Sequence, residues 1–255
     1  MASQTAVQCV AATSRRIGLF VVSLLSGITA PISAQQGDYV TGDVSDGGAI
    51  VGQVTFTGTA STPRRLAITI DTVVCAREPQ FAEDLLVGGG GGLQNVVVWI
   101  SDIREGKAWE PRHSPAALAQ NGCRFVPHVL IVPVGEQFEV WNNDGILHNV
   151  HTRGTENRPV NKAQPGFLRS VRIRLAHAEI VHVECDAHNW MSGWIAVAAH
   201  PYYVITDQDG NYRLDDVPPG TYTLQFWHER LGTETQQVTV TAGGEAQVQA
   251  RFASR

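Results

Sequence analysis

Short runs of alternating apolar and polar residues recur along the chain after its first 40 residues. Residues 49–57, A-I-V-G-Q-V-T-F-T, alternate with a period of two around Val51, Val54 and Phe56, which predicts a strand. Residues 93–100, L-Q-N-V-V-V-W-I, predict a second and more buried strand. Five consecutive glycines immediately before it predict a flexible connector or an unusual turn.

The strand pattern tightens in the second half of the chain. Residues 129–144, V-L-I-V-P-V-G-E-Q-F-E-V-W-N-N-D, predict two strands joined by a tight turn. Further strands are predicted at 171–175, 180–184 and 194–199. The preceding stretch, residues 101–121, contains two prolines and reads as a long connection with one helical turn in A-A-L-A-Q.

The composition supports an all-β fold class. Charged residues make up only 17% of the chain, and glycine, threonine and valine are plentiful, as in exported β proteins. The formal net charge is −5 and no block of lysine or arginine occurs, which argues against nucleic acid as a partner. A mildly acidic surface is compatible with electrostatic steering of a basic protein partner.

The chemistry is concentrated in residues 184–194, E-C-D-A-H-N-W-M-S-G-W, which place Cys185, His188 and Met191 within seven positions. A thiolate, an imidazole and a thioether form a ligand set that suits copper in both of its oxidation states. Trigonal copper sites of this kind need a second imidazole. His148 is the candidate, because it follows the turn-like residues 142–145.

Two separated segments resemble the plastocyanin-like cupredoxins. W-N-N-D-G-I-L-H-N resembles the segment around their first copper histidine, and the C-x2-H-x2-M spacing is most similar to that of amicyanin, a protein of methylamine utilisation. The resemblance implies a Greek-key β-sandwich that binds copper through His148, Cys185, His188 and an axial Met191. It implies that Asn149 hydrogen-bonds to the ligand loops and tunes the thiolate.

The tryptophans and cysteines around this loop carry further expectations. Trp190 and Trp194 are expected to flank the metal and to exclude water. After removal of a leader that contains Cys9, three cysteines remain, and an odd count in an exported protein implies one pair and one thiol with another use. If Cys185 is a ligand, Cys75 pairs with Cys123.

The C-terminal stretch has a different pattern. Asp209-Gly210 lies between alternating runs as a hairpin signal, and Pro218-Pro219-Gly220 predicts a second turn. This pattern resembles the carboxypeptidase regulatory-like module, a transthyretin-like β-sandwich, and residues 49–57 and 93–100 fit its first strand positions. The resemblance implies a second sandwich built from both ends of the chain, with the cupredoxin unit packed against it or inserted within it. Residues 93–100 could alternatively complete the edge of the cupredoxin unit.

The N-terminus has the features of an export signal. Arg15-Arg16 precedes an apolar run at residues 17–25, and P-I-S-A ends at Ala34. The run is too short to cross a membrane, so cleavage after Ala34 and a periplasmic or otherwise exported location are expected, by the ordinary route or the twin-arginine route. The predicted organisation is a signal peptide (1–34), an N-terminal β segment (35–118), a cupredoxin domain (119–200) and a carboxypeptidase regulatory-like module (201–255).

Histidines outside the predicted site remain open. A second metal site or a polar joint between domains would explain several of them, although no metal-type spacing occurs and scattered hydrogen-bonded histidines are the simpler interpretation. Five of these histidines are considered for such a role: His128, His151, His182, His200 and His228.

The leading functional hypothesis is a periplasmic type 1 copper protein that carries single electrons between redox partners such as a dehydrogenase or a cytochrome. Such a carrier is not an enzyme, and the chain has neither a G-x-S-x-G elbow nor an H-E-x-x-H motif. Two alternatives belong to other classes. One is a carrier or sensor that holds Cu(I) for delivery, and the other is a β-sandwich binding module without a metal.

Overall fold

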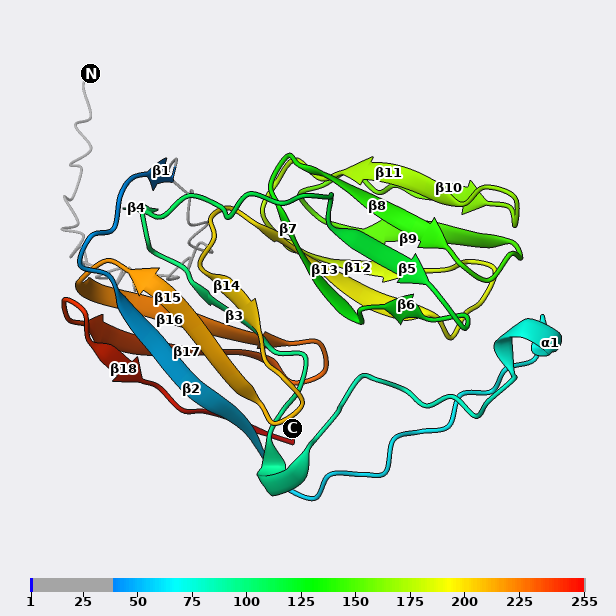
Figure 1. Cartoon of the computed structure of the whole chain (residues 1–255), viewed down its shortest axis with the longest axis horizontal. Helices are drawn as coiled ribbons and strands as arrows, with labels where there is room; N and C mark the ends of the chain where they lie inside the picture. The colour runs from blue at the N-terminus through cyan, green and yellow to red at the C-terminus, as the bar shows by residue number, and fades with distance from the viewer. Residues whose placement is uncertain (2–38, 255) are drawn as a thin grey trace. The chain divides into compact units, whose positions relative to one another are not determined.

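Nearly every element of the chain is a β-strand, as the alternating pattern predicts (Figure 1). The computed structural model describes Met1 and residues 39–254, so the predicted leader lies outside the described residues except for Met1. The helical elements within the described residues are one turn, α1 (Thr72–Cys75), and a 3-10 turn, η1 (Gly89–Gly91). Within the described residues, no helix is long and apolar enough to span a membrane.

Strands β5 to β13 build a two-sheet sandwich that we call the ligand sandwich. One sheet has the order β10-β9-β12-β13-β7 and the other has the order β11-β8-β5-β6. The bounds are β5 Ala117–Gln120, β6 Phe125–Val126, β7 Val129–Pro133, β8 Gln137–Asn142, β9 His148–Arg153, β10 Asn161–Gln164, β11 Ser170–Arg174, β12 Ile180–Glu184 and β13 Ser192–Ala198.

Alternation along β12 explains how this sandwich positions a ligand. Val181 and Val183 are fully buried in the core between the sheets, whereas His182 and Glu184 are partly exposed. Because successive side chains of a strand point to opposite faces, the next residue, Cys185, returns to the core side. Cys185 is 2% exposed at the end of this strand.

A second sandwich, which we call the module sandwich, is built from both ends of the chain. Its sheets have the orders β14-β3-β16-β17 and β15-β2-β18, and β19 also pairs with β2. The bounds are β2 Gly48–Thr57, β3 Val97–Ile100, β14 Tyr203–Ile205, β15 Asn211–Val217, β16 Gly220–His228, β17 Gly232–Val240, β18 Glu245–Gln247 and β19 Ala250–Ala253. A short parallel pair, β1 (Val40–Thr41) and β4 (Glu105–Gly106), lies outside these sheets. The predicted all-β class, with one sandwich inserted in the chain of another, is therefore confirmed.

Two sequence predictions in the first half of the chain are wrong. The A-A-L-A-Q segment is not a helical turn: Ala117–Gln120 forms β5, which pairs with β8 and β6. Burial of Leu118 and Gln120 between the sheets outweighs the helix propensity of these residues. Strand β3 begins at Val97 rather than at residue 93. It pairs with β14 and β16, so the predicted place of this segment in the module sandwich is confirmed and the alternative, an edge of the ligand sandwich, is wrong.

The glycine run forms a tight turn against a hairpin. A Cβ atom at Gly92 would lie 2.1 Å from the carbonyl oxygen of Asp209, and one at Gly88 would lie 2.1 Å from that of Gln208. Gly90, within the turn, has a φ of 71°. Because any side chain at Gly88 or Gly92 would collide with backbone, the run permits a close approach rather than serving as a flexible connector.

Strand β13 is buried on both faces because it contributes to two cores. Ile195 and Val197 belong to the core of the ligand sandwich, whereas Ala196 packs in a separate cluster with Val97 of β3. The same cluster includes Trp194, whose ring lies 4.8 Å from that of Trp227 in the module sandwich. The expectation that Trp194 flanks the metal site is wrong, because Trp194 lies in this joint between the sandwiches.

The connection from β2 to η1 makes a long excursion, which we call the strap (residues 59–87). It runs away from β2 to α1 and back (Figure 1). A bridge between Arg65 and Phe81 pairs its two arms. Cys75 in α1 forms the expected disulfide with Cys123 of the ligand sandwich.

Candidate metal centre

The loop between β12 and β13 carries three of the four predicted ligands, Cys185, His188 and Met191. The backbone N–H of His188 donates to the carbonyl of Cys185 at 3.3 Å, and that of Met191 donates to the carbonyl of His188 at 2.9 Å. These two successive turns fold the loop back on itself. Strands paired in register on both sides hold its ends at Glu184 and Ser192.

His148 reaches the same place from another loop. The turn before it is held by Asn142, whose side-chain oxygen accepts from the backbone N–H groups of Asp144 at 3.2 Å and Gly145 at 3.3 Å. Gly145 has a φ of 69°, a conformation that glycine adopts without strain. Because β9 begins at His148 and pairs with β12, the imidazole lies beside the end of the strand that delivers Cys185.

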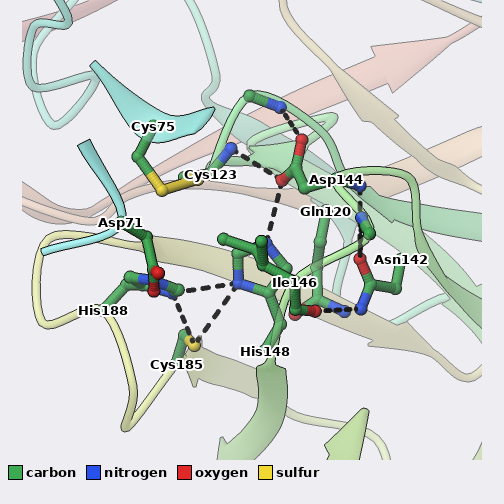
Figure 2. Close-up of polar contacts among 12 residues, drawn as sticks. Asp71, Cys75, Gln120, Cys123, Asn142, Asp144, Ile146, His148, Cys185 and His188 are labelled. Carbon is green, nitrogen blue, oxygen red and sulfur yellow. Dashed lines mark hydrogen bonds and ion pairs between the residues drawn. A yellow bond between two sulfur atoms is a disulfide. The ribbon is translucent and has the colours of Figure 1, made fainter. Parts of the chain in front are cut away.

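Three of the four predicted ligands converge in a buried pocket (Figure 2). The Nδ1 atoms of His148 and His188 lie 3.0 Å apart, and the sulfur of Cys185 lies 3.9 and 3.7 Å from them, respectively. The two imidazoles are fully buried and the cysteine is 2% exposed. One ion with bonds of about 2.0–2.3 Å to nitrogen and sulfur can touch all three atoms at these separations.

Met191, the fourth predicted ligand, is 2% exposed. It packs in the same hydrophobic cluster as Cys185. Its position in the loop is fixed by the hydrogen bond from its backbone N–H to His188. Its assignment as an axial ligand stays a prediction.

A carboxylate holds the outer edge of each imidazole. The Nε2 of His148 donates to Asp144 at 2.9 Å, and the Nε2 of His188 donates to Asp71 at 2.9 Å. A carboxylate on the far nitrogen fixes the tautomer that leaves Nδ1 free for a metal, and it raises the basicity of the ligand. Sequence reasoning missed both residues. Asp144 stands four residues before His148 in the quoted motif, whereas nothing in the sequence links Asp71 to His188.

The pocket lowers the pKa of the Cys185 thiol. Burial raises the pKa of Cys185, but hydrogen bonds from His148 and from backbone N–H groups outweigh burial and lower it. One of these donors is the N–H of Asn149, 3.4 Å from the sulfur. Burial lowers the pKa of His148, but Asp144 and the Cys185 sulfur raise it to about 9. A deprotonated sulfur is the form that binds metals, so the lowered pKa of Cys185 favours metal binding.

Asn149 ties the two ligand loops together. Its side-chain oxygen accepts from the backbone N–H of Asp186 at 2.5 Å and from that of Ala187 at 3.4 Å. Its amide donates to the Asp186 carboxylate at 3.0 Å. Together with the N–H on Cys185, these bonds place Asn149 in the position described by the cupredoxin resemblance.

Trp190 covers His188. The two rings lie 5.0 Å apart, and the indole N–H donates to the carbonyl of Cys123 at 3.2 Å. The indole therefore bridges the ligand loop and the disulfide.

The other histidines do not join the pocket. His128 pairs with Glu229 of the module sandwich, so it is part of a polar joint between the sandwiches. His151 contacts Asp186 at 2.9 Å, next to Glu184, in an exposed cluster. His200 lies against the ring of Tyr39, and His228 lies against Phe252. His182 stacks on Trp194 and contacts the Ser192 hydroxyl at 2.8 Å.

The donor set fits copper and does not fit magnesium or calcium. Magnesium and calcium take oxygen ligands, whereas a thiolate with two imidazoles suits copper, and a nearby thioether suits its reduced state. The carboxylates Asp71 and Asp144 accept hydrogen bonds from the imidazoles, so the converging atoms are one sulfur and two nitrogens.

A family model described as a carboxypeptidase regulatory-like domain matches residues 195–253, so the predicted resemblance of the C-terminal part is confirmed. No curated protein matches the chain.

Among solved structures, the chain is similar to copper proteins over about a third of its length. A copper-containing nitrite reductase from Thermus scotoductus is 25% identical, with a TM-score of 0.31, over 36% of this chain and 24% of that enzyme. The chain therefore spans about a quarter of the enzyme's length. A purple cupredoxin from Nitrosopumilus maritimus is 17% identical, with a TM-score of 0.28, over 32% of this chain and 99% of that protein. An amicyanin variant with Cu(I) is 18% identical, with a TM-score of 0.31, over 35% of this chain and 87% of that protein.

Proposed function

We propose that this chain is an exported type 1 copper protein that accepts and passes single electrons. The observation that carries the proposal is the convergence of His148 Nδ1, Cys185 Sγ and His188 Nδ1 within 4.8 Å of one another in a buried pocket. Two imidazoles and one thiolate are the equatorial set of such sites, and Met191 would be the axial ligand, as in the cupredoxins that the sequence resembles.

Bound copper would supply a one-electron couple, and the residues of this chain would keep the cage unchanged between its two states. The ligand loop is fixed by two paired strands, by Asn149 and by its own turns. The carboxylates of Asp71 and Asp144 hold the imidazoles against rotation. A cage that cannot relax keeps the reorganisation that accompanies electron transfer small.

A carrier that hands over its metal is less well supported. The ligating atoms of His148, Cys185 and His188 belong to side chains that are 0–2% exposed, so a partner's ligands cannot reach the ion without opening the pocket. The partner we propose is a redox protein such as a dehydrogenase or a cytochrome, which needs only electronic contact. The export signal in residues 1–34 supports a periplasmic location.

Reconstitution of the leaderless chain with copper tests the proposal. We expect an intense visible charge-transfer band from thiolate to Cu(II), a narrow hyperfine splitting in electron paramagnetic resonance and reversible voltammetry. Cys185→Ser should abolish the band and the narrow splitting while the fold persists. The exposed histidine variant His113→Asn is the matched control and should retain both.

Two other results would overturn the proposal. Tight Cu(I) binding without the charge-transfer band would indicate copper carriage. Absence of copper binding by the folded chain would leave a β-sandwich binding module.

A further inference from the structure

The strap belongs to the connectivity of the module sandwich, in whose core Leu85 packs, but its far end at α1 contacts the ligand sandwich. It begins after β2, a strand of the module sandwich, and returns to η1, beside which Gly92 forms a bridge with Thr55 of β2. Between these points Cys75 is bonded to Cys123, and the Gln80 amide donates to the carbonyl of Gly122 at 2.6 Å. Asp71 of the strap accepts from His188. The strap thus crosses the end of the ligand sandwich where the candidate ligands converge.

Each half of the disulfide is coupled to one of the two carboxylates that hold the imidazoles (Figure 2). On the strap side, the backbone N–H of Cys75 donates to the carbonyl of Asp71 at 2.8 Å, which is the residue that accepts from His188. Asp71 has a φ of 47°, so its position depends on the turn of α1 that follows it.

On the other side, the backbone N–H of Cys123 donates to the carboxylate of Asp144 at 2.8 Å. The same oxygen of Asp144 accepts from Nε2 of His148 at 2.9 Å. One covalent bond between Cys75 and Cys123 therefore connects the supports of both imidazoles.

The strap is also the outermost layer over His188. The side chain of His188 is fully buried, whereas the side chain of its partner Asp71 is 48% exposed. The path from solvent to the outer nitrogen of His188 therefore passes Asp71. Trp190 covers another part of the ring and does not replace this contact.

The part of the strap before Ala82 is held mainly at separate points. Of residues 59–81, all of which the structure describes, only Cys75 is buried, and Ile68 and Val74 pack partly buried against the core of the ligand sandwich. Ala82 and Leu85, which are buried, lie at the returning end of the strap. A cavity of about 430 Å³ is lined by strap residues together with Trp190 and Met191. A second cavity of about 1060 Å³ is lined by strap residues together with Asn121 and Gly122. Hollow space beside a segment with point anchors permits it to move when an anchor is cut.

We propose that the strap is a cover of the metal centre locked by the Cys75–Cys123 disulfide, and that Asp71 is the positioning residue by which the cover holds His188. Cutting the disulfide opens the cover and gives small reagents access to His188. The role of the cover in electron exchange rests on the proposed copper site, whereas its opening is a property of the metal-free chain.

A dithiol is the class of reductant that would open the lock. The sulfur–sulfur bond between Cys75 and Cys123 breaks and takes up two electrons and two protons, giving two thiols. The dithiol loses the same two electrons and two protons and forms its own disulfide.

Acylation of histidines by diethyl pyrocarbonate in the metal-free, leaderless chain tests the proposal, with each site followed by peptide mass mapping. Treatment with dithiothreitol, or the double variant Cys75→Ser/Cys123→Ser, should raise the rate at His188 by about tenfold or more, the scale of losing one hydrogen bond to a charged group. The exposed His113 should react at an unchanged rate. His228, buried in the module core, should remain protected and so report an intact fold.

A second arm keeps the disulfide, because the chain without it can unfold. Asp71→Ala removes the same hydrogen bond directly and should raise the rate at His188 by about tenfold or more, whereas Asp71→Asn, which retains an oxygen acceptor, should stay within about twofold of the unsubstituted chain. An unchanged rate at His188 in Asp71→Ala, with His228 protected, would overturn the proposal. So would an unchanged rate after reduction in the folded chain.

The outcome separates the cover from the copper site. A chain that shows disulfide-dependent labelling but no charge-transfer band refutes the copper function and keeps the cover. A chain with the band whose His188 reacts at the same rate in all variants keeps the copper function and refutes the cover.

Discussion

The Nδ1 atoms of His148 and His188 face each other at 3.0 Å, although the two residues come from different loops. Their outer nitrogens are each bound to a carboxylate, so neither ring is free to turn away. Two imidazoles fixed in this way beside a thiol form a cage before any ion arrives. The cage gives rise to predictions for the ligands, for their supports and for the sandwiches around them.

Asp144→Ala is expected to weaken copper binding by about 10–100-fold, the usual effect of losing a carboxylate behind a ligating histidine. The variant removes the acceptor for His148 and for the backbone N–H groups of Gly122 and Cys123. Competition titration with a chelator of known affinity measures the change. Asp215→Ala, an exposed carboxylate on β15, should leave the affinity unchanged. Equal affinities in the two variants would contradict a positioning role for Asp144.

Met191→Leu is expected to retain the fold and the charge-transfer band and to move the reduction potential upward. Leucine conserves the volume in the buried site, which costs less than about 1.5 kcal/mol. Loss of the weak axial thioether removes electron density that favours Cu(II). Voltammetry of the reconstituted variant measures the shift. An unchanged potential would show that Met191 is a core residue and not a ligand.

Removal of the disulfide by Cys75→Ser/Cys123→Ser is expected to lower the free energy of unfolding by about 4 kcal/mol. The sequence separation of the two cysteines is 48, and the chain-entropy model gives this value for a loop of that size. Chemical denaturation of the metal-free double variant checks it. A loss below about 1 kcal/mol would contradict the prediction. It would mean that the disulfide restricts the unfolded chain little, because other contacts already order the strap there, or that the strap contributes little to folding.

Acid is expected to destabilise the module sandwich before its carboxylates titrate. Burial lowers the pKa of His200 and of His228 to about 4, so both stay neutral in the folded chain while the unfolded chain protonates them below about pH 6.5. Stability is thus fully present above pH 6.5 and falls between pH 6.5 and 4, by up to about 3 kcal/mol for each histidine. Denaturation curves across this range measure the slope. His200→Asn should flatten it and the exposed His113→Asn should not.

Glu229→Gln is expected to weaken the joint between the sandwiches by about 2 kcal/mol at pH 6, because it removes a buried charged partner. Burial lowers the pKa of His128, but the hydrogen bond and charge of Glu229 outweigh burial and raise it. The contribution of this pair is therefore present below the ordinary pKa of histidine and is lost as the pH rises through the raised pKa of His128. Denaturation at pH 6 and at a more alkaline pH should show a larger difference at pH 6. The exposed variant Glu234→Gln is the matched control.

The convergence of the candidate ligands was predictable because these residues lie in short sequence motifs. Cys185, His188 and Met191 lie within one loop, and His148 follows a turn with a strong local pattern. The apolar pattern also predicted five of the nine strands of the ligand sandwich, β7, β8, β11, β12 and β13.

The errors arise where long-range contacts decide the structure. Residues 117–120 have good helix formers but become a strand, because β8 offers a partner edge and the core takes Leu118. Trp194 lies next to the ligand loop in sequence, but its side chain points to the module sandwich, where Glu229 accepts its indole N–H at 2.9 Å. Asp71 lies in a stretch without pattern, and only the fold brings it to His188. A single sequence contains no local trace of such pairings.

The candidate metal centre depends on the strap as well as on the ligand sandwich. Residues 117–198 include every strand of the ligand sandwich, together with His148, Cys185, His188 and Met191. A fragment cut at those limits would nevertheless lack Asp71 and Cys75, and it would leave the thiol of Cys123 without its partner. A continuous fragment with the complete site has to begin before Asp71, and it therefore includes β3, a strand of the module sandwich. Grafting the inserted sandwich into another protein would thus require carrying along part of its host.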